Sequence, residues 1–273
     1  MKKTLKKLLK RNILTSYKQF LSIIIIVFLS MTLLSGFIVN FNTLSKSVDK
    51  YFEETKLADA WLYVDNVAAE DEQFFIKNKL NYEKRLELNV LTNIETSNVQ
   101  NNSKIFVYDT GKISTPYIVS GLGGCFIDQN VAKNNNLKPG QDIINFSYDY
   151  LVEINGKKET VSLDLSFLIE GTMTLCECAD SYSEWPILIK KEYFLDEFNK
   201  AKDKAFSGVM SDITPENISD LPYNQILLRS KNINEDLTKI SNFYEYESTS
   251  KLIMMLKQDS IESVVLLRGE IEQ

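Results

Sequence analysis

The sequence predicts an α+β protein with one N-terminal transmembrane helix, a mixed α/β extracytoplasmic domain, and a stalk helix at each end of that domain. An apolar stretch covers residues 20–41, and no charged residue lies between Lys18 and Lys46. Beyond it, segments with the two-residue alternation of strands are interspersed with segments of helical spacing. Basic residues precede the apolar stretch, and every acidic residue follows it. These observations separate a membrane anchor from a folded domain.

Residues 20–41, FLSIIIIVFLSMTLLSGFIVNF, are long enough to cross a membrane as a helix, since about 20 apolar residues span a hydrocarbon core of about 30 Å. The small hydroxyl side chains within the stretch can bond back to helix carbonyls, and Ser35 and Gly36 leave a thin face where another membrane helix could approach. A buried core helix is the alternative, but such helices seldom lack a charge over this length. The residues that mark the predicted span are Phe20, Ile23, Ile24, Val27, Phe28, Met31, Leu34, Gly36 and Phe41.

Residues 1–19 form a basic amphipathic segment, with leucines on one side and lysines opposite. Such a segment can lie on an anionic inner leaflet. The positive-inside rule predicts a plasma-membrane protein with a cytoplasmic N-terminus and an extracytoplasmic domain. A cleaved signal peptide is the alternative, but the apolar run exceeds the usual length of about 7–15 residues and no A-x-A-like site follows it.

The charge distribution excludes some partners. Residues 1–46 contain eight of the 31 basic residues and none of the 37 acidic ones, which leaves 23 basic against 37 acidic residues and a net charge of −14 for the remainder. An external domain this acidic is a poor candidate for binding nucleic acid or anionic lipid. We therefore expect no nucleic-acid partner. The lipid bilayer is expected as a partner because of the predicted span.

The first stalk is predicted at residues 42–56, where Leu44, Val48 and Phe52 keep helical spacing beyond the span. The domain is predicted at 57–247, because no linker rich in Pro or Gly divides it. Its first half alternates as strands at 58–64, 82–96 and 104–108, with helical spacing at 71–80.

The block from 120 to 169 contains the clearest local signals. Asp128 follows a short apolar strand and can cap a helix through Asn134. A Pro-Gly turn ends at Gly140, and Asn155-Gly156 lies between two strands as a strong hairpin signal. We therefore expect a compact β unit here.

The second half of the chain is predicted as an irregular loop at 172–184, a strand at 186–189, a helix at 191–204, a loop at 208–221, a strand at 223–229, and a helix at 234–243 opened by a capping Asn. Residues 248–273 have helical spacing and predict a returning stalk, with an amphipathic helix packed on the domain as the plainer alternative. The residues that mark this stalk are Ile253, Leu256, Val264 and Leu267.

The chain contains no histidine and no phosphate-binding loop of the G-x-x-x-x-G-K-[ST] type, so we expect no enzyme activity, no catalytic residue and no bound cofactor. Cys125, Cys176 and Cys178 form no disulfide framework, and a C-x-C pair without histidine lacks the ligands of a metal site. Their oxidation state stays open. A glycosidase using paired carboxylates is an alternative, because acidic residues such as Asp180, Glu184, Asp196 and Glu197 are plentiful, but no pair of them stands out from ordinary surface charge.

The order of the parts resembles the FtsX-like (MacB-type) permeases of ABC transporters. RNILTSYKQFLSIIIIVFLSMTLLSGF resembles the basic entry to their first membrane helix, and VDKYFEETKLADAWLYVDNV the start of their outer, MacB periplasmic-core-like domain. CFIDQNVAKNNNLKPGQDI and FLIEGTM resemble strands and a turn of that domain. SIESVVLLRGEIEQ resembles the helix before the second membrane span.

This resemblance implies a permease component that couples ATP hydrolysis by a separate ABC ATP-binding subunit to movement of the outer domain, for export, extraction or signalling. Its partners would be that subunit and further permease helices. Such permeases contain three more membrane helices, so we expect this chain to be the N-terminal part of one. A single-pass anchored binding or sensor domain is the alternative, and a secreted domain with a cleaved leader is the third possibility.

Overall fold

The computed structural model describes residues 2–95, 99–154, 157–178, 184–207 and 218–258. The chain divides into two compact units. The first contains the N-terminal helices as far as Lys50, and the second extends from Tyr51 to Leu267. Each unit is described by itself below.

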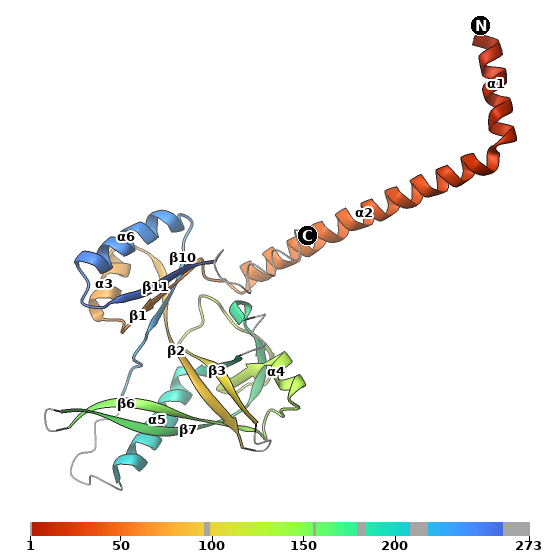
Figure 1. The fold of residues 1–273 in the computed structure, drawn as a ribbon. Helices are drawn as coiled ribbons and strands as arrows, with labels where there is room; N and C mark the ends of the chain where they lie inside the picture. Colours follow the sequence, from red (N-terminus) through yellow and green to blue (C-terminus); the bar gives the residue numbers. More distant parts are fainter. Residues whose placement is uncertain (1, 96–98, 155–156, 179–183, 208–217, 259–273) are drawn as a thin grey trace. The chain divides into compact units, whose positions relative to one another are not determined.

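The first unit consists of helix α1, Lys2–Thr15, and most of helix α2, Tyr17–Glu54 (Figure 1). By length and composition α2 could cross a membrane. Seven of the predicted span residues, Ile23, Ile24, Val27, Phe28, Met31, Leu34 and Phe41, expose their side chains, while Phe20 and Gly36 also lie within the helix. The hydroxyls of Ser30 and Thr32 donate to the carbonyls of Ile26 and Phe28, both at 2.8 Å, as expected for small polar residues in a span.

The second unit is built on one large mixed sheet. Among the described residues its strand order is β11-β1-β10-β2-β3-β9-β5-β8-β4, and β6 joins it by pairing with β2 and β7. The strands are β1 Ala60–Val64, β2 Asn81–Ile94, β3 Val99–Tyr108, β4 Tyr117–Ser120, β5 Cys125–Asp128, β6 Ile143–Ile154, β7 Lys157–Leu168, β8 Gly171–Thr174, β9 Trp185–Lys190, β10 Gln225–Arg229 and β11 Leu252–Lys257. The helices are α3 Ala69–Lys77, α4 Gln129–Asn134, α5 Lys191–Ser207, α6 Ile233–Tyr246 and the single 3₁₀ turn η1 Cys176–Cys178.

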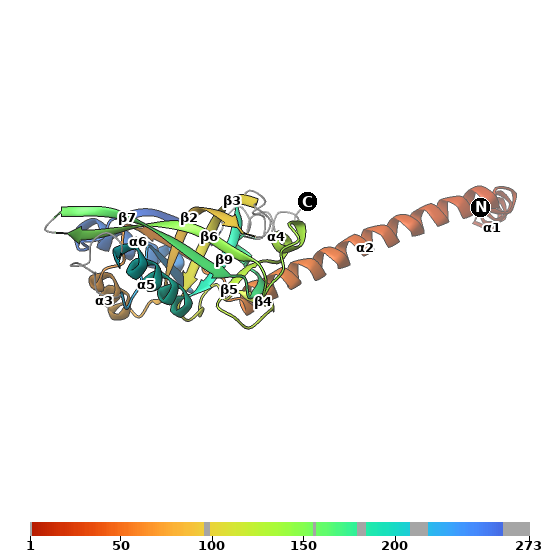
Figure 2. The same ribbon diagram turned by 90° about the horizontal axis from the view of Figure 1, so that it is seen from below.

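The main cores lie on one face of this sheet. Helices α3 and α6 cover β1, β10 and β11 there, and α5 runs along β6 and β7 (Figures 1 and 2). Under α5, the ring of Phe167 stacks on that of Phe194 with centroids 5.9 Å apart, and Phe198 is 1% exposed. Burying each such ring contributes about 1.5–3 kcal/mol. The opposite face of the sheet is thereby left for a polar site and the loops that cover it.

Several local predictions are confirmed. The Asp128 carboxylate accepts from the backbone N–H groups of Asn130 and Val131, at 2.8 and 3.2 Å, and so caps α4. Gly140 has φ +82°, the conformation that favours glycine in its turn. Strands β6 and β7 pair in the register of a hairpin as far as Ile154 and Lys157, and the Asn-Gly turn itself lies outside the described residues.

The prediction of a returning helix is wrong for its first part. Residues 252–257 form strand β11, which pairs with β1 and places Leu256 opposite Trp61. The 3–4 spacing of Ile253 and Leu256 matched a helix, but pairing with a strand nearly 200 positions away decided their conformation. Val264 and Leu267 lie outside the described residues.

Two other predictions need correction. The expected loop at 172–184 contains strand β8 and the turn η1, because Met173 and Leu175 are buried against Phe126 and Leu188. The helix expected at 234–243 with a capping Asn begins at Ile233, so Asn234 lies inside it, and Asn232 at the N-cap position makes no side-chain cap bond. Ser230 Oγ instead accepts from the N–H of Asn232 and donates to Asp236.

Candidate functional site

The last turn of α2 ends inside the second unit. Lys56 adopts the left-handed conformation, φ 49°, and the N–H of Leu57 donates to the carbonyl of Phe52 at 3.0 Å while that of Lys56 donates to Glu53 at 3.1 Å. This pair of bonds is a Schellman motif, which usually places an apolar contact between the first and last of its residues. Phe52 and Leu57 hold those positions and are 6% and 2% exposed. The helix therefore stops at an apolar anchor.

A loop of the domain holds this helix end through backbone bonds. The N–H groups of Ser114 and Thr115 donate to the carbonyls of Lys56 and Thr55, at 2.8 and 2.7 Å. Ser114 Oγ accepts from the N–H of Ala58 at 3.1 Å. The loop thus supplies partners for carbonyls that a helix end would otherwise leave unpaired.

The same loop is fixed to the centre of the sheet by Glu83 of β2. Its carboxylate accepts from Thr110 Oγ1 at 3.0 Å and from the N–H groups of Gly111 and Ile113 at 2.6 and 2.7 Å. The cavity beside Glu83 has a volume of about 10 Å³, and Arg85 and Ser114 also line it. It can hold about one water molecule. The junction between helix, loop and β2 is thus packed without room for a ligand.

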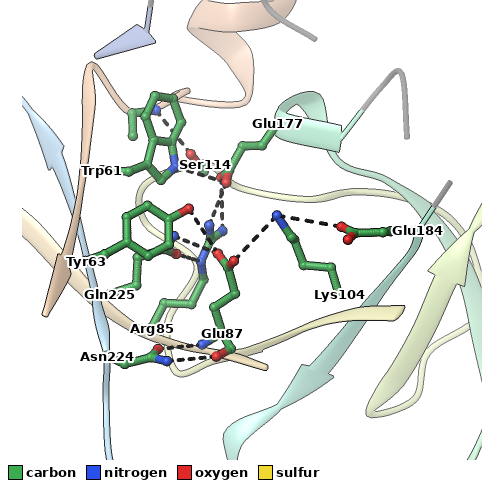
Figure 3. A network of polar contacts seen from close by, with 11 residues as sticks. Trp61, Tyr63, Arg85, Glu87, Lys104, Ser114, Glu177, Glu184, Asn224 and Gln225 are labelled. Carbon is green, nitrogen blue, oxygen red and sulfur yellow. Dashed lines mark hydrogen bonds and ion pairs between the residues drawn. The ribbon is translucent and has the colours of Figure 1, made fainter. Parts of the chain in front are cut away.

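A buried polar network adjoins Glu83 on the same face of the sheet (Figure 3). The Arg85 guanidinium donates to both carboxylate oxygens of Glu177, at 3.0 and 2.5 Å, and to Gln225 Oε1 at 2.5 Å. Trp61 Nε1 donates to Glu177 at 2.9 Å. The Arg85 and Glu177 side chains are 4% and 6% exposed. Burial lowers the pKa of Arg85, but the carboxylate of Glu177 outweighs this effect and raises that pKa overall, so the guanidinium stays charged.

Glu87 extends the network along β2. Its carboxylate accepts from Gln225 Nε2 at 2.7 Å and from the Tyr63 hydroxyl at 3.3 Å, and Lys104 lies 3.5 Å away. Burial and the neighbouring Glu87 carboxylate raise the pKa of Tyr63 above its ordinary value. Asn224 pairs through its side-chain amide with the backbone N–H and carbonyl of Glu87, both at 2.8 Å. Charged and polar groups from β1, β10, β2, β3 and η1 are therefore bonded into one unit, as Figure 3 shows.

Three residues were named in the sequence as marking the first stalk. Phe52 is buried at the junction and Val48 is half-buried in α2, while Leu44 lies in the same helix. Glu83, Arg85 and Glu177 were not predicted. Charged residues alternating with Leu86 and Leu88 along β2 were a signal of one polar strand face.

Of the four acidic residues considered for hydrolysis, the three within the described part of the chain each pair with a lysine. Asp196 and Glu197 both bond Lys200, at 2.6 and 2.9 Å, on the exposed side of α5. Glu184 lies 3.9 Å from Lys104, and Asp180 lies outside the described residues. Within the described ranges, the structure brings no cluster of possible metal ligands together.

A separate groove of about 300 Å³ lies between the ends of two strand pairs. The residues that line it are Leu91, Thr92 and Asn93 of β2, Gln100 of β3, Asn145, Phe146 and Ser147 of β6, and Asp164, Leu165 and Ser166 of β7. It lies at the lower end of the volumes usual for ligand sites.

No family model and no curated protein matches the chain. Among solved structures, the extracellular domain of the noncanonic ABC-type transporter YknZ from Gram-positive bacteria is similar to 72% of this chain and 100% of its own, at 6% sequence identity and a TM-score of 0.40. At that TM-score the likeness does not establish a shared fold or function.

Proposed function

We propose that this chain is a membrane component of an FtsX-like (MacB-type) ABC transporter permease, in which α2 transmits movement between the bilayer and an extracytoplasmic domain. The observation that carries the proposal is the continuity of α2. One helix contains the exposed apolar residues 20–41 and ends in a motif bonded into the domain's fold. The ordered sequence segments that resemble this family supply the assignment to it.

The bonds at the junction explain how movement would be passed on. A displaced helix end would pull on loop 109–116 through the carbonyls of Thr55 and Lys56, and the loop would pull on β2 through Glu83. Strand β2 pairs with both β10 and β3, so the force would reach the centre of the sheet. The buried charges of Arg85 and Glu177 resist deformation because separating them leaves each desolvated without a partner. The domain would therefore move as a rigid body.

The proposed topology follows the charge distribution. Residues 1–19 lie at the cytoplasmic surface, 20–41 span the bilayer, and 42–56 form a stalk of about 22 Å at 1.5 Å per residue. A separate ATP-binding subunit would supply the energy, and the domain would export, extract or signal. The chain's own residues would bind no nucleotide.

The experiment that tests this function is purification of the chain from its native membrane in a mild detergent, with identification of the proteins that accompany it. We expect an ATP-binding subunit, and we expect ATP with vanadate to change hydrogen exchange at 51–58 and 109–116 relative to ADP. Ser114→Ala, which removes the acceptor for Ala58 N–H, should weaken that response. Ser207→Ala on the exposed end of α5 is the matched control. Absence of an ATP-binding partner, or identical exchange in both nucleotides, would refute the proposal.

Reading the gene beyond codon 273 and its neighbours is a second test. Three further apolar spans and an adjacent ATPase gene would support the permease. A stop codon with no ATPase gene nearby would favour a single-pass anchored binding or sensor domain. The groove of about 300 Å³ is the observation that favours this second function, because it offers space for a ligand within the domain.

A further inference from the structure

The groove lies where strands β2 and β6 separate. On one edge, β2 pairs with β10 as far as Arg85 and with β6 only at Asn93 and Ile94. Among the described residues, no strand pairs with this edge of β2 from 86 to 92, nor with the matching edge of β6 beyond Asn145. Figure 1 shows β6 and β7 diverging from β2 and β3 beyond their contact. We name the space between the two open edges the notch.

The backbone groups that face the notch can be assigned from bonds at its two ends. In an antiparallel strand the N–H and C=O of one residue point to the same edge, and the edge alternates along the chain. Glu87 bonds Asn224 on this edge, and the N–H of Glu95 donates to the carbonyl of Ile143 of β6. The odd-numbered residues between them, Asn89 and Leu91, therefore direct their N–H and C=O groups into the notch.

Asn224 shows what this edge binds. Its side-chain amide donates to the Glu87 carbonyl and accepts from the Glu87 N–H, both at 2.8 Å, as the backbone of a paired strand would. The next two residues of the edge, Asn89 and Leu91, are exposed, and Leu91 leaves 58% of its surface to solvent. The Leu91 side chain and the backbone N–H and C=O groups of Asn89 and Leu91 are thus open next to one another.

The side chains that line the groove are neutral except for one carboxylate. Asn93 Oδ1 is buried and has no hydrogen-bond partner among the described residues. The Asp164 carboxylate accepts from Ser147 Oγ at 2.8 Å and is the one charged group in the lining. Amides and hydroxyls from Gln100, Asn145 and other residues make up most of the rest.

We propose that the notch binds an extended peptide segment without acidic side chains, which adds to the open edge of β2 as a further strand. Its main chain bonds Asn89 and Leu91, and one apolar side chain covers Leu91. Strand addition of this kind takes its affinity from main-chain bonds and its selectivity from alternate side chains. The Asp164 carboxylate and the acidic composition of the domain disfavour acidic peptides. The inference does not depend on the transporter role.

The test uses the full chain in detergent micelles and the peptide acetyl-TVTVT-amide as the probe. We expect saturating peptide to slow hydrogen exchange at the amides of Asn89 and Leu91 about tenfold, because both gain an acceptor. The same peptide with every main-chain amide methylated should have no effect. This comparison uses the unaltered chain, so it decides the proposal even when a variant fails to fold.

A matched pair of variants locates the site. Leu91→Pro removes one donor from the notch without removing a bond to β3, and should weaken peptide binding about tenfold. Leu151→Pro makes the same change at an exposed leucine on the open edge of β6, away from the groove, and should leave binding unchanged. Equal slowing by the methylated peptide, no slowing at the peptide's solubility limit, equal loss in both variants, or slowing by maltose in place of the peptide would each overturn the proposal.

Discussion

Replacing Glu177 by Ala should strongly destabilise the domain that contains the polar network. The substitution leaves the Arg85 guanidinium, 4% exposed, without its bidentate partner and removes the acceptor of Trp61 Nε1. Breaking one side of a buried ion pair costs about 3–5 kcal/mol. A domain of 150–250 residues loses about 2–4 °C of Tm per kcal/mol, so the expected fall is about 6–20 °C.

The assay is thermal unfolding of the full chain in detergent, followed by tryptophan fluorescence, with Asp196→Ala as the control. Asp196 bonds Lys200 at an exposed position, so its loss should leave Tm unchanged. The double variant Arg85→Met/Glu177→Gln tests whether the unpaired buried charge causes the loss of stability. The double variant should be more stable than Arg85→Met alone, because no unpaired charge stays buried. The reasoning would be refuted if the Glu177→Ala chain had the same Tm as the control. It would also be refuted if the loss of stability in the double variant equalled the sum of the two single losses.

Three further outcomes are expected. Glu83→Ala should speed hydrogen exchange at amides 113–115 while leaving α5 unchanged, because three bonds that hold the loop are lost; equal exchange in both chains would contradict this. Gly171→Ala should cost about 3 kcal/mol or more in denaturant unfolding, since its Cβ would clash with the backbone carbonyl oxygen of Ser120; an unchanged midpoint would count against it. Burial raises the pKa of both Cys125 and Cys178, which keeps them as thiols at pH 8, so in a Cys176→Ser chain they should react with iodoacetamide only after unfolding.

Local signals in the sequence predicted the local structure well. The Asp128 cap and the β6–β7 hairpin depend on residues close together in the chain, and both were found where expected. Helical spacing after the apolar stretch likewise predicted a helix over 42–56, and α2 continues to Glu54. Such features follow from short-range geometry, which the sequence states directly.

Features set by distant partners were missed. Strand β11 acquires its conformation from β1, and its apolar run at 252–257 fits a helix equally well. Arg85 and Glu177 are 92 positions apart, and nothing near either one marks the other. Charges alternating with leucines along β2 indicated a polar face, but a solvated face gives the same pattern. The packing of η1, Trp61 and Phe106 against that face makes it a buried site.

The measurement that tests the account most directly is labelling with a membrane-impermeant maleimide in intact cells or spheroplasts. Single cysteines would replace Lys6, before the span, and Leu122, which is fully exposed in the domain, in the Cys176→Ser chain. The account predicts that Leu122→Cys reacts in intact cells and that Lys6→Cys reacts only after lysis. Labelling of Lys6→Cys in intact cells, or recovery of the chain in the soluble fraction, would contradict a domain anchored outside the membrane by α2.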